Sequence, residues 1–286
     1  MRFVAWSSII GNEVKRMKTG VSTASLFLRK NNEEALPLLH NLGVNRAEVF
    51  LTSFSEYDPS FAEVLQKEKG DLCVNSIHVL NTQYEPQLFS AHERVRADAY
   101  FWLDKVLQSA KILGASYYTF HGTARVKRAS RSGENDDFPS MIKGFESILS
   151  ACDRYGVSLC LENVEWSTYN RVGVFSKLKE ALPTLKTVLD IKQARISKYP
   201  YESYLSEMGE RLAYLHISDI DERNKICLPG KGRFDFDTLI KRLQDGGFDG
   251  TLLVEVYTGD YGAESELKAS CEYIDELLYK YNCLTK

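Results

Sequence analysis

Short runs of β-branched and aromatic residues alternate along the chain with longer segments whose apolar residues recur at the helical period. The short runs predict buried strands, and the longer segments predict amphipathic helices. Eight strands are expected, at residues 19–25, 46–51, 73–80, 116–122, 157–163, 185–191, 212–218 and 251–257.

Two of the intervening segments show the helical period especially well. In residues 92–114 the apolar positions are Val95, Ala99, Trp102, Val106, Ala110 and Leu113. Near the end of the chain they are Leu267, Cys271, Ile274, Leu277, Leu278 and Tyr281. Glycines that we expect to end helices as left-handed caps precede several strands: Gly43, Gly114, Gly156 and Gly247.

Eight strands alternating with helices over roughly 250 residues predict an α/β fold of the (β/α)₈ barrel type. A doubly wound open sheet is the alternative, but no Gly-x-Gly-x-x-Gly motif follows the first strand. No linker or change of composition divides the chain. We therefore expect one domain over residues 18–286 and an N-terminal extension over residues 1–17.

The extension lacks the long apolar segment and cleavage site of a signal peptide. Glu13 and Val14 could be encoded by GAG-GTG, a ribosome-binding sequence two codons ahead of Met17. We therefore expect Met17 to be the true start, and an N-terminal mass of the native protein would test this. The polar stretch at residues 125–137 is expected to form a long surface loop.

The composition narrows the classes of function. A formal net charge of −3 gives no overall basic character for nucleic acid or a membrane surface. No apolar run reaches the ~18 residues that a transmembrane helix needs. The six cysteines include no Cys-x-x-Cys pair, which favours a reducing, cytoplasmic location.

Polar residues stand at the carboxyl ends of six consecutive predicted strands, where a barrel of this type places its active site. One such residue is usually structural, but six converging on one rim indicate a functional site. Three buried carboxylates need a neutralising cation, and two glutamates, an aspartate and a histidine suit one divalent ion: Mn, Mg, Co or Zn. The six are His78, His121, Glu162, Asp190, His216 and Glu255.

From about Lys18 onward the chain resembles the xylose isomerase-like barrels, which include ketose 3-epimerases, hydroxypyruvate isomerases, inosose dehydratases and the endonuclease IV group. The resemblance rests on the order and spacing of SIHVL, LGASYYTFHGT, GVSLCLENVEW, VLDIKQA, LHISDIDERNKICLPGKGRFDF and LLVEVY. It implies that the metal ligands are Glu162, Asp190, His216 and Glu255. It also implies that Glu162 and Glu255 are catalytic, one on each side of the carbon that loses a proton.

The resemblance implies a metal-dependent isomerase or epimerase of a sugar or sugar phosphate, acting next to a carbonyl through an enediolate. The expected substrate contacts are His78, His121, Gln193, Arg223 and Trp166. Arg223, with Lys231 and Arg233, could meet a phosphate or carboxylate. Relatives often form dimers or tetramers, so a homo-oligomer is compatible with this interpretation.

Two positions depart from the family. Gln193 stands where relatives often have a histidine, and Cys227 lies near the place of another. Both losses remove ligands of a trinuclear zinc nuclease, so neither that activity nor a nucleic-acid partner is expected. A dehydratase-like lyase on the same metal and a non-catalytic sugar-binding barrel remain alternatives.

Overall fold

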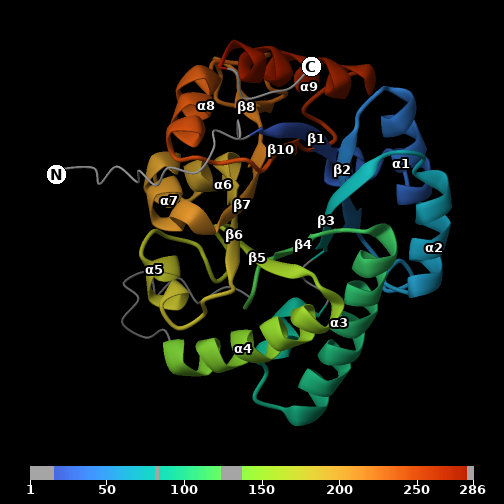
Figure 1. Cartoon of the computed structure of the whole chain (residues 1–286), viewed down its shortest axis with the longest axis vertical. Coiled ribbons are helices and arrows are strands. Elements are labelled where there is room, and N and C mark those ends of the chain that lie inside the picture. The colour runs from blue at the N-terminus through green and yellow to red at the C-terminus, as the bar shows by residue number, and fades with distance from the viewer. Residues whose placement is uncertain (1–15, 81–83, 124–136, 282–286) are drawn as a thin grey trace, which may run out of the picture.

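A computed structural model describes residues 16–80, 84–123 and 137–281. Within them, eight parallel strands close into a barrel in the order β1-β10-β7-β6-β5-β4-β3-β2, and helices surround it (Figure 1). The strands are β1 (Lys18–Ser22), β2 (Arg46–Leu51), β3 (Cys73–Val79), β4 (Tyr117–Phe120), β5 (Ser158–Glu162), β6 (Lys186–Asp190), β7 (Leu212–Ile217) and β10 (Thr251–Val254). The predicted (β/α)₈ barrel and all eight expected strands are confirmed.

Helices follow the strands and pack their apolar faces on the outside of the barrel. They are α1 (Asn32–Asn41), α2 (Pro59–Glu68), α3 (Glu93–Leu113), α4 (Phe138–Tyr155), α5 (Val174–Lys179), α6 (Ile191–Ile196), α7 (Tyr201–Met208), α8 (Phe236–Asp245) and α9 (Ser265–Lys280). The four glycines expected as helix ends all have positive φ angles, as predicted. Among the described residues, no helix has the length and apolar character needed to cross a membrane.

A short antiparallel hairpin of β8 (Asp219–Ile220) and β9 (Ile226–Cys227) was not expected from the sequence. Its buried anchor is Asp219, whose carboxylate accepts backbone N–H groups from Gly230, Gly232 and Phe234. These bonds fold the following glycine-rich loop against the hairpin. The expected surface loop at residues 125–137, apart from its last residue, lies outside the described residues, as do most of the extension and Cys283. Met17 packs in the core.

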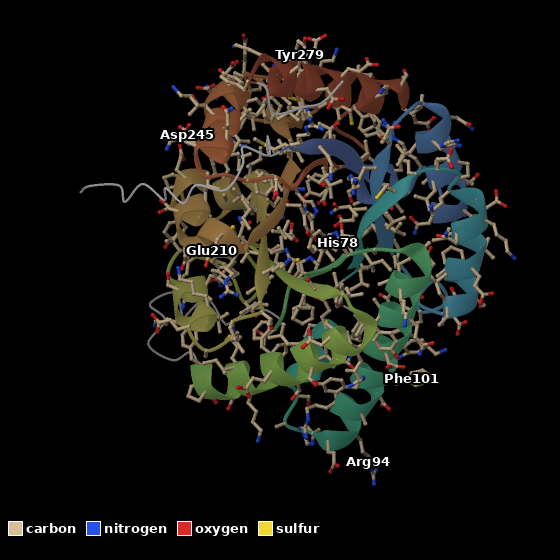
Figure 2. All side chains as sticks on the ribbon, in the orientation of Figure 1. His78, Arg94, Phe101, Glu210, Asp245 and Tyr279 are labelled. Carbon is tan, nitrogen blue, oxygen red and sulfur yellow. The ribbon has the colours of Figure 1, made fainter. Side chains whose placement is uncertain are left out.

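Alternate residues of each strand point into the barrel. On four neighbouring strands an apolar inward residue is followed, two positions later, by a polar one. The pairs are Cys160 and Glu162, Val188 and Asp190, Tyr214 and His216, and Leu253 and Glu255. The carboxyl end of the barrel therefore receives buried polar side chains above an apolar layer. Figure 2 shows His78 in the middle of the ring, with Arg94 and Phe101 at its periphery.

Candidate functional site

Glu162, His216 and Glu255 meet at the carboxyl end of the barrel. His216 Nδ1 lies 2.8 Å from Glu162 Oε1 and 3.0 Å from Glu255 Oε2. Glu255 Oε2 has no hydrogen bond among the described residues, although it is buried. Strands β6 and β7 lie between β5 and β10, so the two glutamates approach His216 from separate parts of the barrel.

Asp190 joins this group from the end of β6. Its Oδ1 accepts a 2.9 Å hydrogen bond from the backbone N–H of Gln193 and so caps helix α6. Asn163 fixes the backbone of Asp190 on both sides, accepting from its N–H at 2.7 Å and donating to its carbonyl at 2.9 Å. Ligand atoms of Glu162, Asp190 and His216 all lie within 4.8 Å of one another.

The charges of this cluster are strongly coupled. Burial alone would lower the pKa of His216, but Glu255, Glu48 and Glu162 raise it well above its usual value. Burial raises the pKa of Asp190 to about 6, assisted by Glu162 and Glu255 and opposed by Lys192. Burial and the neighbouring glutamates therefore disfavour the charged form of Asp190, and a cation bound beside it would favour that form.

His78 and His121 form a second pair beside the cluster, with their Nε2 atoms 3.0 Å apart. His121 Nε2 lies 3.2 Å from Glu162 Oε2, and its Nδ1 lies 3.0 Å from the buried carboxylate of Glu85. Burial would lower the pKa of His121, but Glu85 and Glu162 raise it to about 10. Glu85, from the 3₁₀ turn at residues 85–89, thus orients His121, and sequence reasoning missed it.

Glu48 is completely buried and lies close to both His78 and His216. Its Oε1 is 3.2 Å from His78 Nδ1 and 3.0 Å from His216 Nε2, the latter without the alignment of a hydrogen bond. Ser22 and Ser76 also donate hydrogen bonds to its carboxylate. Glu48 is therefore a buried partner of the site histidines.

Lys192 is a further charged residue that the sequence did not identify. It is 3% exposed, and its Nζ lies 3.5 Å from Asp190 Oδ2 and 3.4 Å from Glu255 Oε1. Burial alone would lower the pKa of Lys192, but the two carboxylates raise it above its usual value. The ammonium is therefore part of the acidic cluster.

A cavity of about 330 Å³ opens above these residues. Four of the expected substrate contacts line it, namely His78, His121, Gln193 and Trp166. Apolar walls come from Phe27, Phe50, Val164 and Tyr257. The fifth expected contact, Arg223, lies exposed on the turn of the β8–β9 hairpin and is not among the lining residues.

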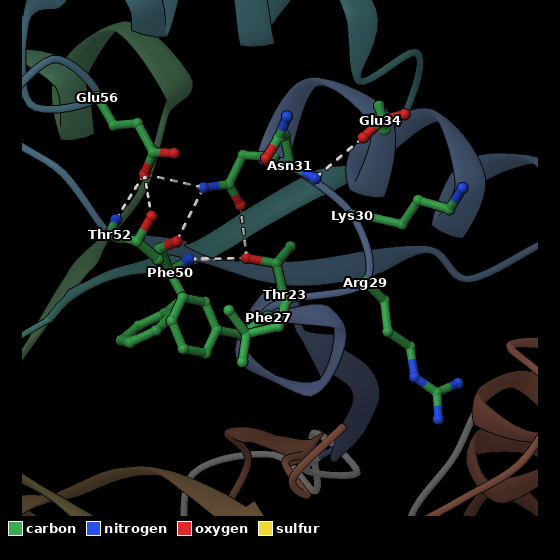
Figure 3. A pocket seen from close by; sticks show the side chains of 11 residues that line it. Thr23, Phe27, Arg29, Lys30, Asn31, Glu34, Phe50, Thr52 and Glu56 are labelled. Carbon is green, nitrogen blue, oxygen red and sulfur yellow. Dashed lines mark hydrogen bonds between the residues drawn. The ribbon is translucent and has the colours of Figure 1, made fainter. Parts of the chain in front are cut away.

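A second pocket of about 280 Å³ shares the Phe27 and Phe50 walls with this cavity (Figure 3). Its polar side chains are largely bonded to one another. Thr23 donates to Asn32 at 2.7 Å, and Asn32 donates to the Phe50 carbonyl at 2.8 Å. These residues hold the β1–α1 segment against β2, so the ionisable cluster remains the better candidate for chemistry.

The side chains present fit a divalent metal ion. Carboxylate oxygens and one imidazole are suitable donors for Mn²⁺, Mg²⁺, Co²⁺ or Zn²⁺. The unbonded Glu255 Oε2, close to His216 Nδ1, is an acceptor that a cation would satisfy. Ligand atoms also gather in two neighbouring groups: Glu48, His78, His216 and Glu255, and His78, His121 and Glu162.

The chain is similar in sequence to a known sugar epimerase and in structure to several solved barrels. The chain is 23% identical over 181 residues to fructoselysine 3-epimerase of Escherichia coli O157:H7, covering 61% of this chain and 65% of that enzyme. The crystal structure of a D-tagatose 3-epimerase-like protein superposes with a TM-score of 0.74 at 16% identity, covering 93% of this chain and 98% of the other. The structure of the IolI protein with a bound zinc atom gives a TM-score of 0.72 at 17% identity, covering 93% and 99%.

At these identities the solved structures establish the fold alone. The family profile reaches further, because the profile of the xylose isomerase-like TIM barrels matches residues 36–277. That range contains all four expected metal ligands and spans most of the barrel. The chain belongs to the xylose isomerase-like TIM barrel family.

Proposed function

We propose that this protein is a divalent-metal-dependent isomerase or epimerase of a sugar or sugar phosphate. The observation that carries the proposal is the convergence of Glu162 and Glu255 on His216 Nδ1, at 2.8 and 3.0 Å, beside the 330 Å³ cavity. The similarity to fructoselysine 3-epimerase and to ketose epimerase structures supports a ketose or ketose derivative as substrate.

Glu162, Asp190, His216 and Glu255 would hold the metal. When bound, the ion would polarise a carbonyl or hydroxyl oxygen of the substrate and so make the neighbouring C–H acidic. One of the two glutamates accepts that proton as general base, and the other returns a proton as general acid. Return to the opposite face of the same carbon gives an epimer, and return to the neighbouring carbon gives an isomer.

The rest of the cavity orients the sugar. His78 and His121 line the cavity, where a substrate hydroxyl group would compete with the contact between their Nε2 atoms, and the Gln193 amide lines the same space. Trp166, whose ring centre lies 5.3 Å from that of His121, offers a flat face for the apolar side of the ring or chain. Arg223 stays a predicted contact for an anionic group, reached only by a substrate that extends beyond the cavity.

The test is solvent proton exchange in D₂O. Metal-free protein is loaded with Mn²⁺, Co²⁺, Mg²⁺ or Zn²⁺ and incubated with ketoses, ketose phosphates, an inosose and an amino-acid derivative of fructose. The proposal expects deuterium at the carbon next to the carbonyl, with an isomeric product, seen by proton NMR. Consumption of substrate with loss of water would instead indicate a lyase, and binding without exchange would indicate a sugar-binding protein.

A further inference from the structure

The ammonium group of Lys192 sits inside the acidic cluster. Helix α6 starts directly after β6, and its second residue turns its side chain back toward the barrel, where the ring centre of Tyr257 lies 4.6 Å from Nζ. A lysine is almost never this buried unless carboxylates accompany it. Lys192 is therefore not a solvated surface charge of helix α6, and its burial indicates another role.

Asp190 and Glu255 each divide their two oxygens between different partners. Glu255 turns Oε2 toward His216 Nδ1 and Oε1 toward Lys192, at 3.0 and 3.4 Å. Asp190 gives Oδ1 to the cap of α6 and Oδ2 to Lys192, at 2.9 and 3.5 Å. Lys192 thus bridges the two carboxylates while leaving Glu255 Oε2 close to His216.

The positive charge of Lys192 affects both the carboxylates and any metal ion that they bind. Glu162, Asp190 and Glu255 lie close together in a poorly solvated site, where repulsion between carboxylates is strong. The Lys192 ammonium offsets part of that repulsion before any metal binds. A divalent ion held by the same carboxylates would be repelled by the ammonium group, since both are positively charged.

We propose that Lys192 is a built-in counter-ion of the metal centre, which holds Asp190 and Glu255 together before a divalent ion binds and weakens the binding of that ion. The inference rests on the proposed function, since it requires that these carboxylates are metal ligands. Lys192 acts through the two carboxylates and is therefore a positioning residue.

The experiment compares the full chain with its Lys192→Met variant, which keeps a long unbranched side chain and removes the charge. Metal-free protein is titrated with Mn²⁺ by calorimetry, and Tm is measured with and without Mn²⁺. We expect the Kd for Mn²⁺ to fall roughly tenfold, because a repelling charge is removed near a divalent ion. We expect the Tm of the metal-free variant to fall as well, so that Mn²⁺ raises Tm by more than in the parent chain.

Three further variants separate this role from simple support of the fold. Lys192→Arg keeps the charge and should restore the Kd of the parent chain. Lys192→Gln removes the charge while keeping a hydrogen-bond donor, and it replaces the methionine variant if that one does not fold without metal. Lys198→Met removes an exposed lysine on the segment after α6 and should change neither Kd nor Tm.

A merely structural lysine gives the opposite sign, since its loss would weaken Mn²⁺ binding and stability together. An unchanged or higher Kd in Lys192→Met, with normal Mn²⁺ binding by the parent chain, overturns the inference and leaves the metal site intact. Failure of every chain to bind Mn²⁺, Co²⁺, Mg²⁺ or Zn²⁺ overturns the proposed function and this inference together.

Discussion

On β5, β6, β7 and β10 the inward residues just below the candidate site are apolar, with Val188 and Leu253 completely buried among them. On β2, β3 and β4 the buried residues Glu48, Ser76 and Thr119 are polar. Both hydroxyl groups donate hydrogen bonds to the Glu48 carboxylate, as does Ser22 of β1. Strands β5, β6, β7 and β10 form the apolar half of the barrel, which carries the four expected metal ligands at its rim. Strands β1 to β4 form the polar half, which carries the two cavity histidines.

The difference shows how the barrel buries so many charges. The apolar half excludes water beneath the carboxylates, which strengthens every electrostatic interaction above it. The polar half supplies Glu48, which accepts a hydrogen bond from His78 and places its negative charge beside His216 Nε2. One half thus provides the ligands and the other provides their support.

The largest expected effect follows from neutralising a glutamate at the rim of the apolar half. Glu162→Gln and Glu255→Gln should each slow proton exchange by about 10²–10⁴-fold at saturating metal, because each removes a general acid–base group. The rate of deuterium incorporation measures this. Glu222→Gln, on the exposed turn of the hairpin, is the matched control and should leave the rate unchanged. A near-normal rate in either glutamate variant with metal bound would refute the assignment of these two residues.

The next effect concerns the apolar layer itself. Leu253→Ala should lower the free energy of unfolding by about 2–5 kcal/mol, because it leaves a cavity inside the barrel. Urea denaturation measures this loss, and one metal ion per folded chain should still bind. A variant of unchanged stability would mean that this layer does not support the site as described.

The sequence predicts the strands and their rim residues well, because alternation along a barrel strand fixes which side chains point inward. It therefore places Glu162, Asp190, His216 and Glu255 at one end of the barrel. The burial of Lys192 in the site was not predicted, because a lysine at the start of a helix is usually exposed to solvent. Arg223 lies on the turn of the unexpected hairpin and is not among the residues that line the cavity, so its contact with the substrate stays a prediction.

The smallest expected effect concerns Glu48 in the polar half of the barrel. Glu48→Gln should weaken metal binding by roughly 10–100-fold, because it removes the charge behind His216 while keeping the shape of the side chain. Calorimetric titration of metal-free protein gives the Kd. Glu85→Gln, which removes the charge behind His121, is the comparison and should change the Kd much less. A larger effect of Glu85→Gln would place the ion on the histidine pair instead.

The proposed function requires that one metal ion is held by Glu162, Asp190, His216 and Glu255. Elemental analysis tests this on protein purified without a metal-affinity tag, beside an Asp190→Asn/His216→Ala double variant. We expect about one Mn, Mg, Co or Zn per chain in the parent protein and none in the folded double variant. A parent chain that holds no metal after reconstitution with each ion would contradict it.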